Sequence, residues 1–195
     1  RDCLLSRGLG DVYKRQAYSG SVRLPFSNKT GCQNPMIHIY YGDGKGKTSA
    51  ALGLALRACG AGKAVSFYSF LKDDQSAERQ ARCDIHFYKN PERLPFLFKM
   101  TDAQKAAYAA WVKTAVQSAF ADSANVIILD EFLDVLPLLG SGFAQTLVFD
   151  PKKEYVITGH AKCAWLFDRA DYITCMRKER HPYDSGVSAR RGIEY

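Results

Sequence analysis

The residues most able to do chemistry form the run Gly42-Asp43-Gly44-Lys45-Gly46-Lys47-Thr48-Ser49. Its glycines let successive backbone N–H groups converge on an anion, and a following helix adds the positive end of its dipole. Lys47 then offers a mobile positive charge to a phosphate and Thr48 a hydroxyl to Mg²⁺. The apolar stretch 36–41 before the run and the helix-like stretch from Ala50 after it favour a nucleotide phosphate loop over an ordinary surface loop rich in glycine and lysine.

A pair of carboxylates is the second candidate. Asp130 and Glu131 directly follow the apolar stretch Val126-Ile127-Ile128-Leu129. An aspartate at the end of such a strand can hold the Mg²⁺ shell beside a phosphate loop. We therefore expect Thr48 and Asp130 to hold Mg²⁺ (or Mn²⁺). Glu131 joins Lys47 and Thr48 as a candidate catalytic residue, because a carboxylate here orients water against the γ-phosphate in many ATPases, although in a group-transfer enzyme it need not contact water.

The stretches that must position these residues alternate between strand-like and helix-like patterns. This alternation predicts an α/β fold with a doubly wound, mostly parallel sheet of the P-loop NTPase (RecA-like) type. Between residues 72 and 100 the chain is charged, irregular and interrupted by two prolines, which is typical of a long functional loop. We expect strands at residues 37–41, 64–71, 85–88, 126–130, 155–158 and 172–176, and helices at residues 47–59, 102–120, 132–139, 142–148 and 161–169.

The first 35 residues are expected to be a non-native or disordered leader, separate from one domain at residues 36–195. The run Asp11-Val12-Tyr13-Lys14-Arg15-Gln16 back-translates to a sequence resembling a transposon end used in sequencing adapters, so residues 1–16 are interpreted as an artefact. The leader holds six of the 27 basic and two of the 20 acidic residues, which leaves a net charge of only +3 for the rest. This weak charge gives no support for nucleic-acid binding.

Composition narrows the class of protein further. No run approaches the roughly 18 apolar residues that span a bilayer, and a signal-peptide pattern is missing at the start. The four cysteines after the leader, at positions 59, 83, 163 and 175, have no metal-binding spacing. The sequence therefore predicts a cytoplasmic protein that does not bind membranes.

The motifs together resemble one family, the P-loop corrinoid adenosyltransferases of the CobA/BtuR type. The family loop G-N-G-K-G-K-T-T, followed by A-A-x-G-x-A-x-R, stands here as GDGKGKTSAALGLALR from Gly42 to Arg57. Leu129-Asp130-Glu131 matches the family's L-D-E. The chain's end, ITGHAKCAWLFDRADYITCMRKERHPYDSGVSARRGIEY, follows the family's closing pattern, with His160 in place of the usual arginine.

The resemblance implies transfer of the 5′-deoxyadenosyl group of ATP to the cobalt of a reduced corrinoid, cob(I)alamin or a precursor, with release of triphosphate. It implies ATP as co-substrate, a flavin-type reductase as partner and a possible homodimer. The residues it assigns to nucleotide or corrinoid binding are the loop Gly42, Asp43, Gly44, Lys45, Gly46, Lys47, Thr48 and Ser49, then Arg57 and His160, and the aromatic pair Phe96 and Phe98.

Alternatives remain open from the residues alone. Another P-loop ATPase or small-molecule kinase would use the same loop and the same Asp130-Glu131 pair, and a non-catalytic ATP-dependent corrinoid-binding protein would keep both affinities without turnover. Arg57 is equally interpretable as a surface charge, and Phe96 and Phe98 as side chains that plug the core.

Overall fold

The computed structural model describes residues 34–91, 94–95 and 97–194. Their strands form one six-stranded sheet, in the order β3-β2-β4-β5-β1-β6, in which every pair is parallel. The strands are β1 (Met36–Tyr41), β2 (Val65–Ser69), β3 (Ile85–Phe87), β4 (Val126–Asp130), β5 (Glu154–Gly159) and β6 (Tyr172–Cys175). The predicted α/β fold with a parallel sheet is confirmed.

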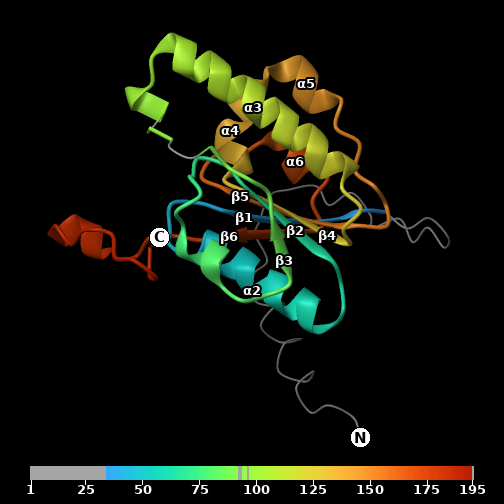
Figure 1. The fold of residues 1–195 in the computed structure, drawn as a ribbon, viewed down its shortest axis with the longest axis horizontal. Coiled ribbons are helices and arrows are strands. Elements are labelled where there is room, and N and C mark those ends of the chain that lie inside the picture. The colour runs from blue at the N-terminus through green and yellow to red at the C-terminus, as the bar shows by residue number, and fades with distance from the viewer. Residues whose placement is uncertain (1–33, 92–93, 96, 195) are drawn as a thin grey trace, which may run out of the picture. The chain divides into compact units, whose positions relative to one another are not determined.

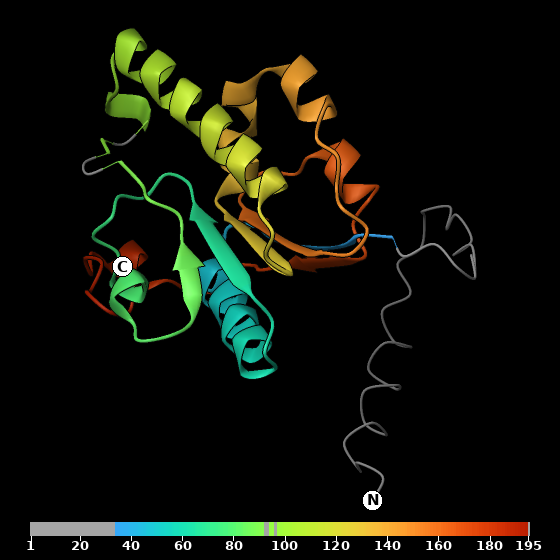
Figure 2. The same cartoon turned by 45° about the vertical axis from the view of Figure 1, so that its right-hand side comes forward.

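Helices cover both faces of this sheet (Figure 1). The helix α2 (Lys47–Gly60) lies on one face, and the remaining helices lie on the other, as the rotated view also shows (Figure 2). This second group contains α3 (Asp102–Ala121), α4 (Phe132–Leu139), α5 (Ser141–Gln145) and α6 (Ala164–Phe167). The doubly wound arrangement follows, because parallel strands need crossover connections and each crossover helix buries an apolar stripe on a sheet face.

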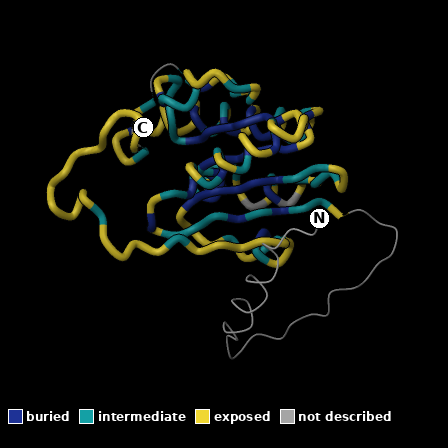
Figure 3. Tube along the Cα trace, turned by 90° about the horizontal axis from the view of Figure 1, so that it is seen from below, coloured by how far each residue is buried: buried dark blue, intermediate teal, exposed yellow. Residues whose placement is uncertain are grey.

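Two hydrophobic clusters fill the space between the layers. On the α2 face, Ala51 and Ala55 pack against Phe67, Ile128 and Val156. The larger cluster, on the opposite face, joins alternate strand residues to α3, α4 and α6. Both faces of β2 and β4 are buried, which explains why their sequences are continuously apolar or small instead of alternating. Figure 3 shows these central strands as buried and the segment after β6 as largely exposed.

Most predicted boundaries hold to within a few residues. The long helix α3 begins where expected, because Thr101 accepts a hydrogen bond from the Gln104 N–H and the Gln104 side chain accepts one from the Thr101 N–H. The largest differences are α6, which spans only Ala164–Phe167 of the expected 161–169, and α5, which spans Ser141–Gln145 where 142–148 was expected. The described residues between 72 and 100 are irregular as expected, apart from β3 and two short 3₁₀ helices, Ala77–Gln80 and Leu97–Lys99. Among the described residues, no helix is long and apolar enough to cross a membrane.

Candidate functional site

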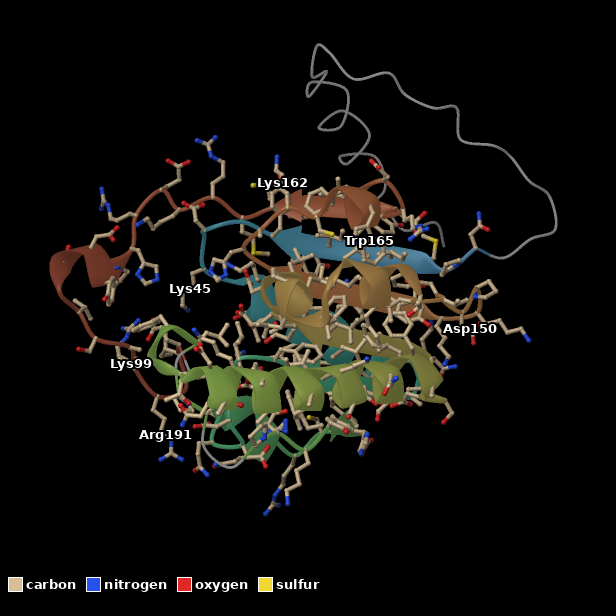
Figure 4. The ribbon with its side chains drawn as sticks, turned by 90° about the horizontal axis from the view of Figure 1, so that it is seen from above. Lys45, Lys99, Asp150, Lys162, Trp165 and Arg191 are labelled. Carbon is tan, nitrogen blue, oxygen red and sulfur yellow. The ribbon has the colours of Figure 1, made fainter. Side chains whose placement is uncertain are left out.

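The polar residues of interest gather where the carboxyl ends of the parallel strands meet. This edge is where ligands bind in open α/β sheets. Lys45 follows β1 and lies at this end of the molecule together with Lys99 and Arg191, whereas Asp150, which precedes β5, lies at the other end (Figure 4). The sheet therefore brings the sequence motifs to a single edge.

The loop between β1 and α2 is held in a tight conformation around Lys47. The Lys47 side chain is buried at 7% exposure. Its Nζ donates to the carbonyl oxygens of Gly42, at 2.7 Å, and Gly44, at 3.0 Å. A buried ammonium curled into its own loop is already desolvated and lies beside the N-terminus of α2. It can exchange these carbonyls for the oxygens of an anion.

Two of the loop glycines are required by the close approach of the segment after β6. A Cβ on Gly42 would lie 2.4 Å from the carbonyl oxygen of Met176, and one on Gly44 would lie 2.8 Å from the backbone of Arg177. The Gly44 N–H donates to that same Met176 oxygen at 2.8 Å. Gly42 also has a φ of 112°, a conformation that favours glycine. The loop between β1 and α2 and the segment after β6 are therefore in close backbone contact, which leaves no room for a side chain at Gly42 or Gly44.

Asp130 is the centre of a buried polar cluster. Its carboxylate is fully buried. Asp130 Oδ1 accepts a hydrogen bond from Thr158 at 2.7 Å, and Asp130 Oδ2 accepts one from Thr48 at 3.2 Å. The Thr158 hydroxyl in turn accepts from the Glu131 N–H at 2.9 Å. The structure thus brings Thr48 of the loop and Asp130 of β4 into contact, although β5 separates β1 from β4 in the sheet.

Lys72 completes this cluster, and the sequence analysis did not identify it. Its Nζ lies 2.8 Å from Asp130 Oδ2, 3.3 Å from Thr48 Oγ1 and 3.5 Å from Glu78 Oε1. Burial lowers the pKa of Lys72, but the charges of Asp130, Glu78 and Glu131 outweigh it, so the pKa lies above its ordinary value. Lys72 therefore stays charged beside Asp130. Lys72 lies three residues after the end of β2, and no residue pattern in the sequence distinguishes it there from a solvated lysine.

Glu131, Asp134 and His160 form a second group beside this cluster. His160 Nδ1 lies 3.1 Å from Asp134 Oδ2 and 3.7 Å from Glu131 Oε2. Burial is the largest cause that raises the pKa of Glu131 to about 7, and the charge of Asp130 and the hydrogen bond and charge of Asp134 add to it, while Lys72 opposes it. Glu131 also has a φ of 62°, the left-handed region that a side chain adopts at a cost of about 1–3 kcal/mol. Such strain is typical of functional positions.

The oxygen atoms around Asp130 are suitable ligands for a small divalent cation. Thr48 and Asp130 supply the oxygen ligands that Mg²⁺ prefers. Ser69 pairs with Asp130 in the β2–β4 register, and alternation along β2 puts it on the same face as Phe67, toward α2. Its hydroxyl is buried and has no hydrogen-bond partner among the described residues. A buried hydroxyl without a partner beside a carboxylate fits a water of the Mg²⁺ shell, because such an atom is otherwise costly.

The two aromatic candidates differ in what the structure describes. Phe96 lies outside the described residues. Phe98 is 80% exposed, and Lys99 Nζ lies 5.8 Å from the centre of its ring. The interpretation of Phe98 as a side chain that plugs the core is therefore wrong.

Beside this segment, an apolar pocket of about 710 Å³ opens between the described residues of 88–100 and the first half of α3. Its lining includes Tyr88, Tyr108, Trp111 and Asn90. The Asn90 side chain donates to the carbonyl oxygen of Lys72 at 3.0 Å. One hydrogen bond therefore connects this aromatic pocket to the Asp130 cluster.

The remaining candidates lie around the loop or away from it. Lys45 donates to the carbonyl oxygen of Ile193 at 3.1 Å, and Asp43 accepts from the Lys178 N–H at 3.3 Å, a bond that lowers the pKa of Asp43. Ser49 is exposed in the first turn of α2. Arg57 is exposed in the last turn of α2, roughly 15 Å along the helix from Lys47 at 1.5 Å per residue, so the structure does not bring it to the other candidates.

Comparisons with known proteins show which family and which relatives this chain is similar to. A family model described as ATP:corrinoid adenosyltransferase BtuR/CobO/CobP matches residues 33–195. The corrinoid adenosyltransferase of Escherichia coli strain K12 is 30% identical over 169 residues, which cover 82% of this chain and 85% of the relative. The corrinoid adenosyltransferase CobA of Salmonella typhimurium gives the same identity and coverage. The corrinoid adenosyltransferase of Pseudomonas aeruginosa is 28% identical over 174 residues, which cover 82% of this chain and 83% of the relative.

Proposed function

Because the chain belongs to the ATP:corrinoid adenosyltransferase family BtuR/CobO/CobP, we propose that it transfers the 5′-deoxyadenosyl group of ATP to the cobalt of a reduced corrinoid. The observation that carries the proposal is the contact between the two motifs, Thr48 to Asp130 at 3.2 Å, beside the buried Lys47. In the reaction, the electron pair of cobalt(I) forms a bond to C5′ of ATP. The bond between C5′ and the oxygen that bridges it to the triphosphate breaks, and triphosphate leaves with the electron pair of that broken bond.

The chain's own residues act on the leaving triphosphate. Lys47 and the N–H groups of the loop and of the first turn of α2 would stabilise the charge that develops on its oxygens. Thr48 and Asp130 would hold Mg²⁺, which supplies further positive charge to the phosphates. No activated nucleophile is needed on the protein, since reduced cobalt is itself the nucleophile.

Orientation of the corrinoid is the second task. The pocket beside the described residues of 88–100 is apolar and aromatic, and the exposed Phe98 lies in the chain between two of its lining residues, Pro95 and Met100. We propose that this side of the molecule receives part of the corrinoid and excludes water from the cobalt. Exclusion of a lower ligand from the cobalt would ease its reduction to cobalt(I). We propose that a flavin-type reductase in the cytoplasm donates the electron. We also propose that the protein forms a homodimer, and light scattering on the purified protein tests this by measuring its molar mass in solution.

One experiment tests the central claim. The protein is mixed with ATP, Mg²⁺ and chemically reduced cobalamin, and the absorbance change that accompanies cobalt–carbon bond formation is followed while the nucleotide products are separated. Triphosphate in a 1:1 ratio to alkylated cobalamin is expected. Release of ADP and phosphate would instead indicate an ATPase or kinase, and binding of both ligands without a product in a single turnover would indicate a binding protein.

A further inference from the structure

Lys72 contacts the same two side chains that suit the divalent cation. Its Nζ lies 2.8 Å from Asp130 Oδ2 and 3.3 Å from Thr48 Oγ1. An ammonium and a metal ion cannot both occupy the space between these oxygens, since two positive charges a few ångströms apart repel strongly at a partly buried site. The two cations therefore compete for Asp130.

The backbone around Lys72 is fixed, whereas its side chain has room to move. Leu71 has a φ of 57°, and with Glu131 it is one of two non-glycine residues with positive φ in the described part of the chain. The Leu71 N–H donates to the Tyr108 hydroxyl at 2.8 Å, and the Lys72 carbonyl accepts from Asn90. The Lys72 side chain remains 25% exposed.

On its open side, Lys72 lines a pocket of about 340 Å³. Thr48, Ser49 and the C-terminal residues Gly192 and Ile193 line the same pocket. This space adjoins the start of α2, where a phosphate chain held by Lys47 would lie. A displaced Lys72 ammonium would therefore meet the phosphates without a change in the backbone.

We propose that Lys72 is an exchangeable counter-ion for Asp130. It neutralises the buried carboxylate, gives way to the divalent cation, and then contacts the oxygens of the triphosphate as a positioning residue. Glu78, 3.5 Å from Nζ, guides the ammonium toward the pocket. The last step rests on the proposed function, whereas the exchange at Asp130 does not.

The first test measures Mn²⁺ binding to the full chain without nucleotide, from the electron paramagnetic resonance signal of free Mn²⁺. Lys72→Met and Lys72→Gln remove the charge, Lys72→Arg keeps it, and Lys153→Met is the matched control. Lys153 is also a partly buried lysine paired with an aspartate, Asp150, but it precedes β5 at the other end of the sheet. Thermal unfolding of each variant establishes that it is folded.

We expect Lys72→Met and Lys72→Gln to bind Mn²⁺ at least about tenfold more tightly than the wild type. Removal of one adjacent positive charge changes the binding free energy by more than the amount that corresponds to a tenfold change in affinity. Lys72→Arg and Lys153→Met should match the wild type, and Asp130→Asn added to Lys72→Met should remove the gain. Equal Mn²⁺ affinity in Lys72→Met and the wild type would overturn the proposal.

A second test uses the unaltered protein. Brief acetylation followed by mass spectrometry reports how accessible each lysine is, with Lys153 as the internal reference. Mg²⁺ alone should increase acetylation of Lys72, because the ammonium leaves Asp130, and ATP with Mg²⁺ should then decrease it. A Lys72 reactivity unchanged by Mg²⁺ would refute the exchange. If Mg²⁺ raises the reactivity but ATP does not lower it, the exchange stands and contact with the triphosphate is refuted.

Neither test requires a corrinoid. Failure of adenosyl transfer in the product assay would leave the Mn²⁺ result intact, and failure of the Mn²⁺ result would leave the reaction intact. The two conclusions therefore stand or fall separately.

Discussion

Replacement of Glu131 by glutamine should stabilise the protein at alkaline pH. The perturbation removes a carboxyl group whose side chain is 18% exposed and whose pKa is raised from 4.5 to about 7, first by burial and then by Asp130 and Asp134. Between these two pH values the unfolded chain releases the proton and the folded chain keeps it. The contribution of Glu131 to stability is therefore fully present below pH 4.5 and is lost as the pH rises through 7.

The magnitude follows from the shift. At 1.36 kcal/mol per pKa unit, the change from 4.5 to about 7 corresponds to about 3 kcal/mol. For a chain of this size, that difference shifts the melting temperature by roughly 6–12 °C. Glutamine avoids the loss because it has no charge, and its amide N–H can still donate to Asp134.

The assay is urea unfolding of the wild type and Glu131→Gln in EDTA, at intervals from pH 4.5 to 8.5. The free energy of unfolding of the variant minus that of the wild type should rise by about 3 kcal/mol over this range, with half of the rise complete roughly midway between pH 4.5 and 7 and a plateau above pH 7. The exposed Glu179 provides the control variant Glu179→Gln, which should show no such rise. Parallel stability curves for Glu131→Gln and the wild type would refute the reasoning.

Three further outcomes are expected. Lys47→Ala should lose about 3 kcal/mol of transition-state stabilisation, roughly a hundredfold in rate, while cob(I)alamin binding remains, and near-normal turnover would contradict the phosphate-loop assignment. Gly44→Ala should weaken ATP binding and lower the melting temperature, since its Cβ would lie 2.8 Å from the backbone of Arg177, whereas Gly53→Ala in α2, with open space around it, should not. Phe98→Ala should impair the reaction with cob(II)alamin plus reductant more than that with cob(I)alamin and should leave stability nearly unchanged, because the ring is 80% exposed; equal losses in both reactions would contradict a role in reduction.

The fold was predictable because its information is local. The central strand β4 is buried on both faces, so it appears in the sequence as an apolar run that ends at Asp130, and α3 carries its own capping signal at Thr101 and Gln104. Lys47, Thr48 and Asp130 were predictable for a related reason. A phosphate loop and an acid-terminated strand each have a recognisable residue pattern, and parallel strands bring both to one edge.

Lys72 and Thr158 were not predictable in the same way, since their roles depend on the order of the strands. Sequence alternation does not indicate that β2 and β5 are the two neighbours of β4. Only this order brings Lys72, after β2, and Thr158, in β5, to either side of Asp130. A single lysine or threonine at a strand end has no pattern that distinguishes it from a solvated one.

The consequence of His160 follows only when the family resemblance is considered together with the residues around its side chain. The resemblance marked it only as a substitution for arginine in a nucleotide site. In the structure its ring lies against Asp134 and Glu131. An arginine there would carry a permanent charge and bind carboxylates through a two-pronged guanidinium, whereas an imidazole is charged only when protonated. Two partly buried carboxylates are thus left with weaker compensation in this chain, which is consistent with a Glu131 pKa of about 7 and makes His160→Arg the substitution expected to lower it.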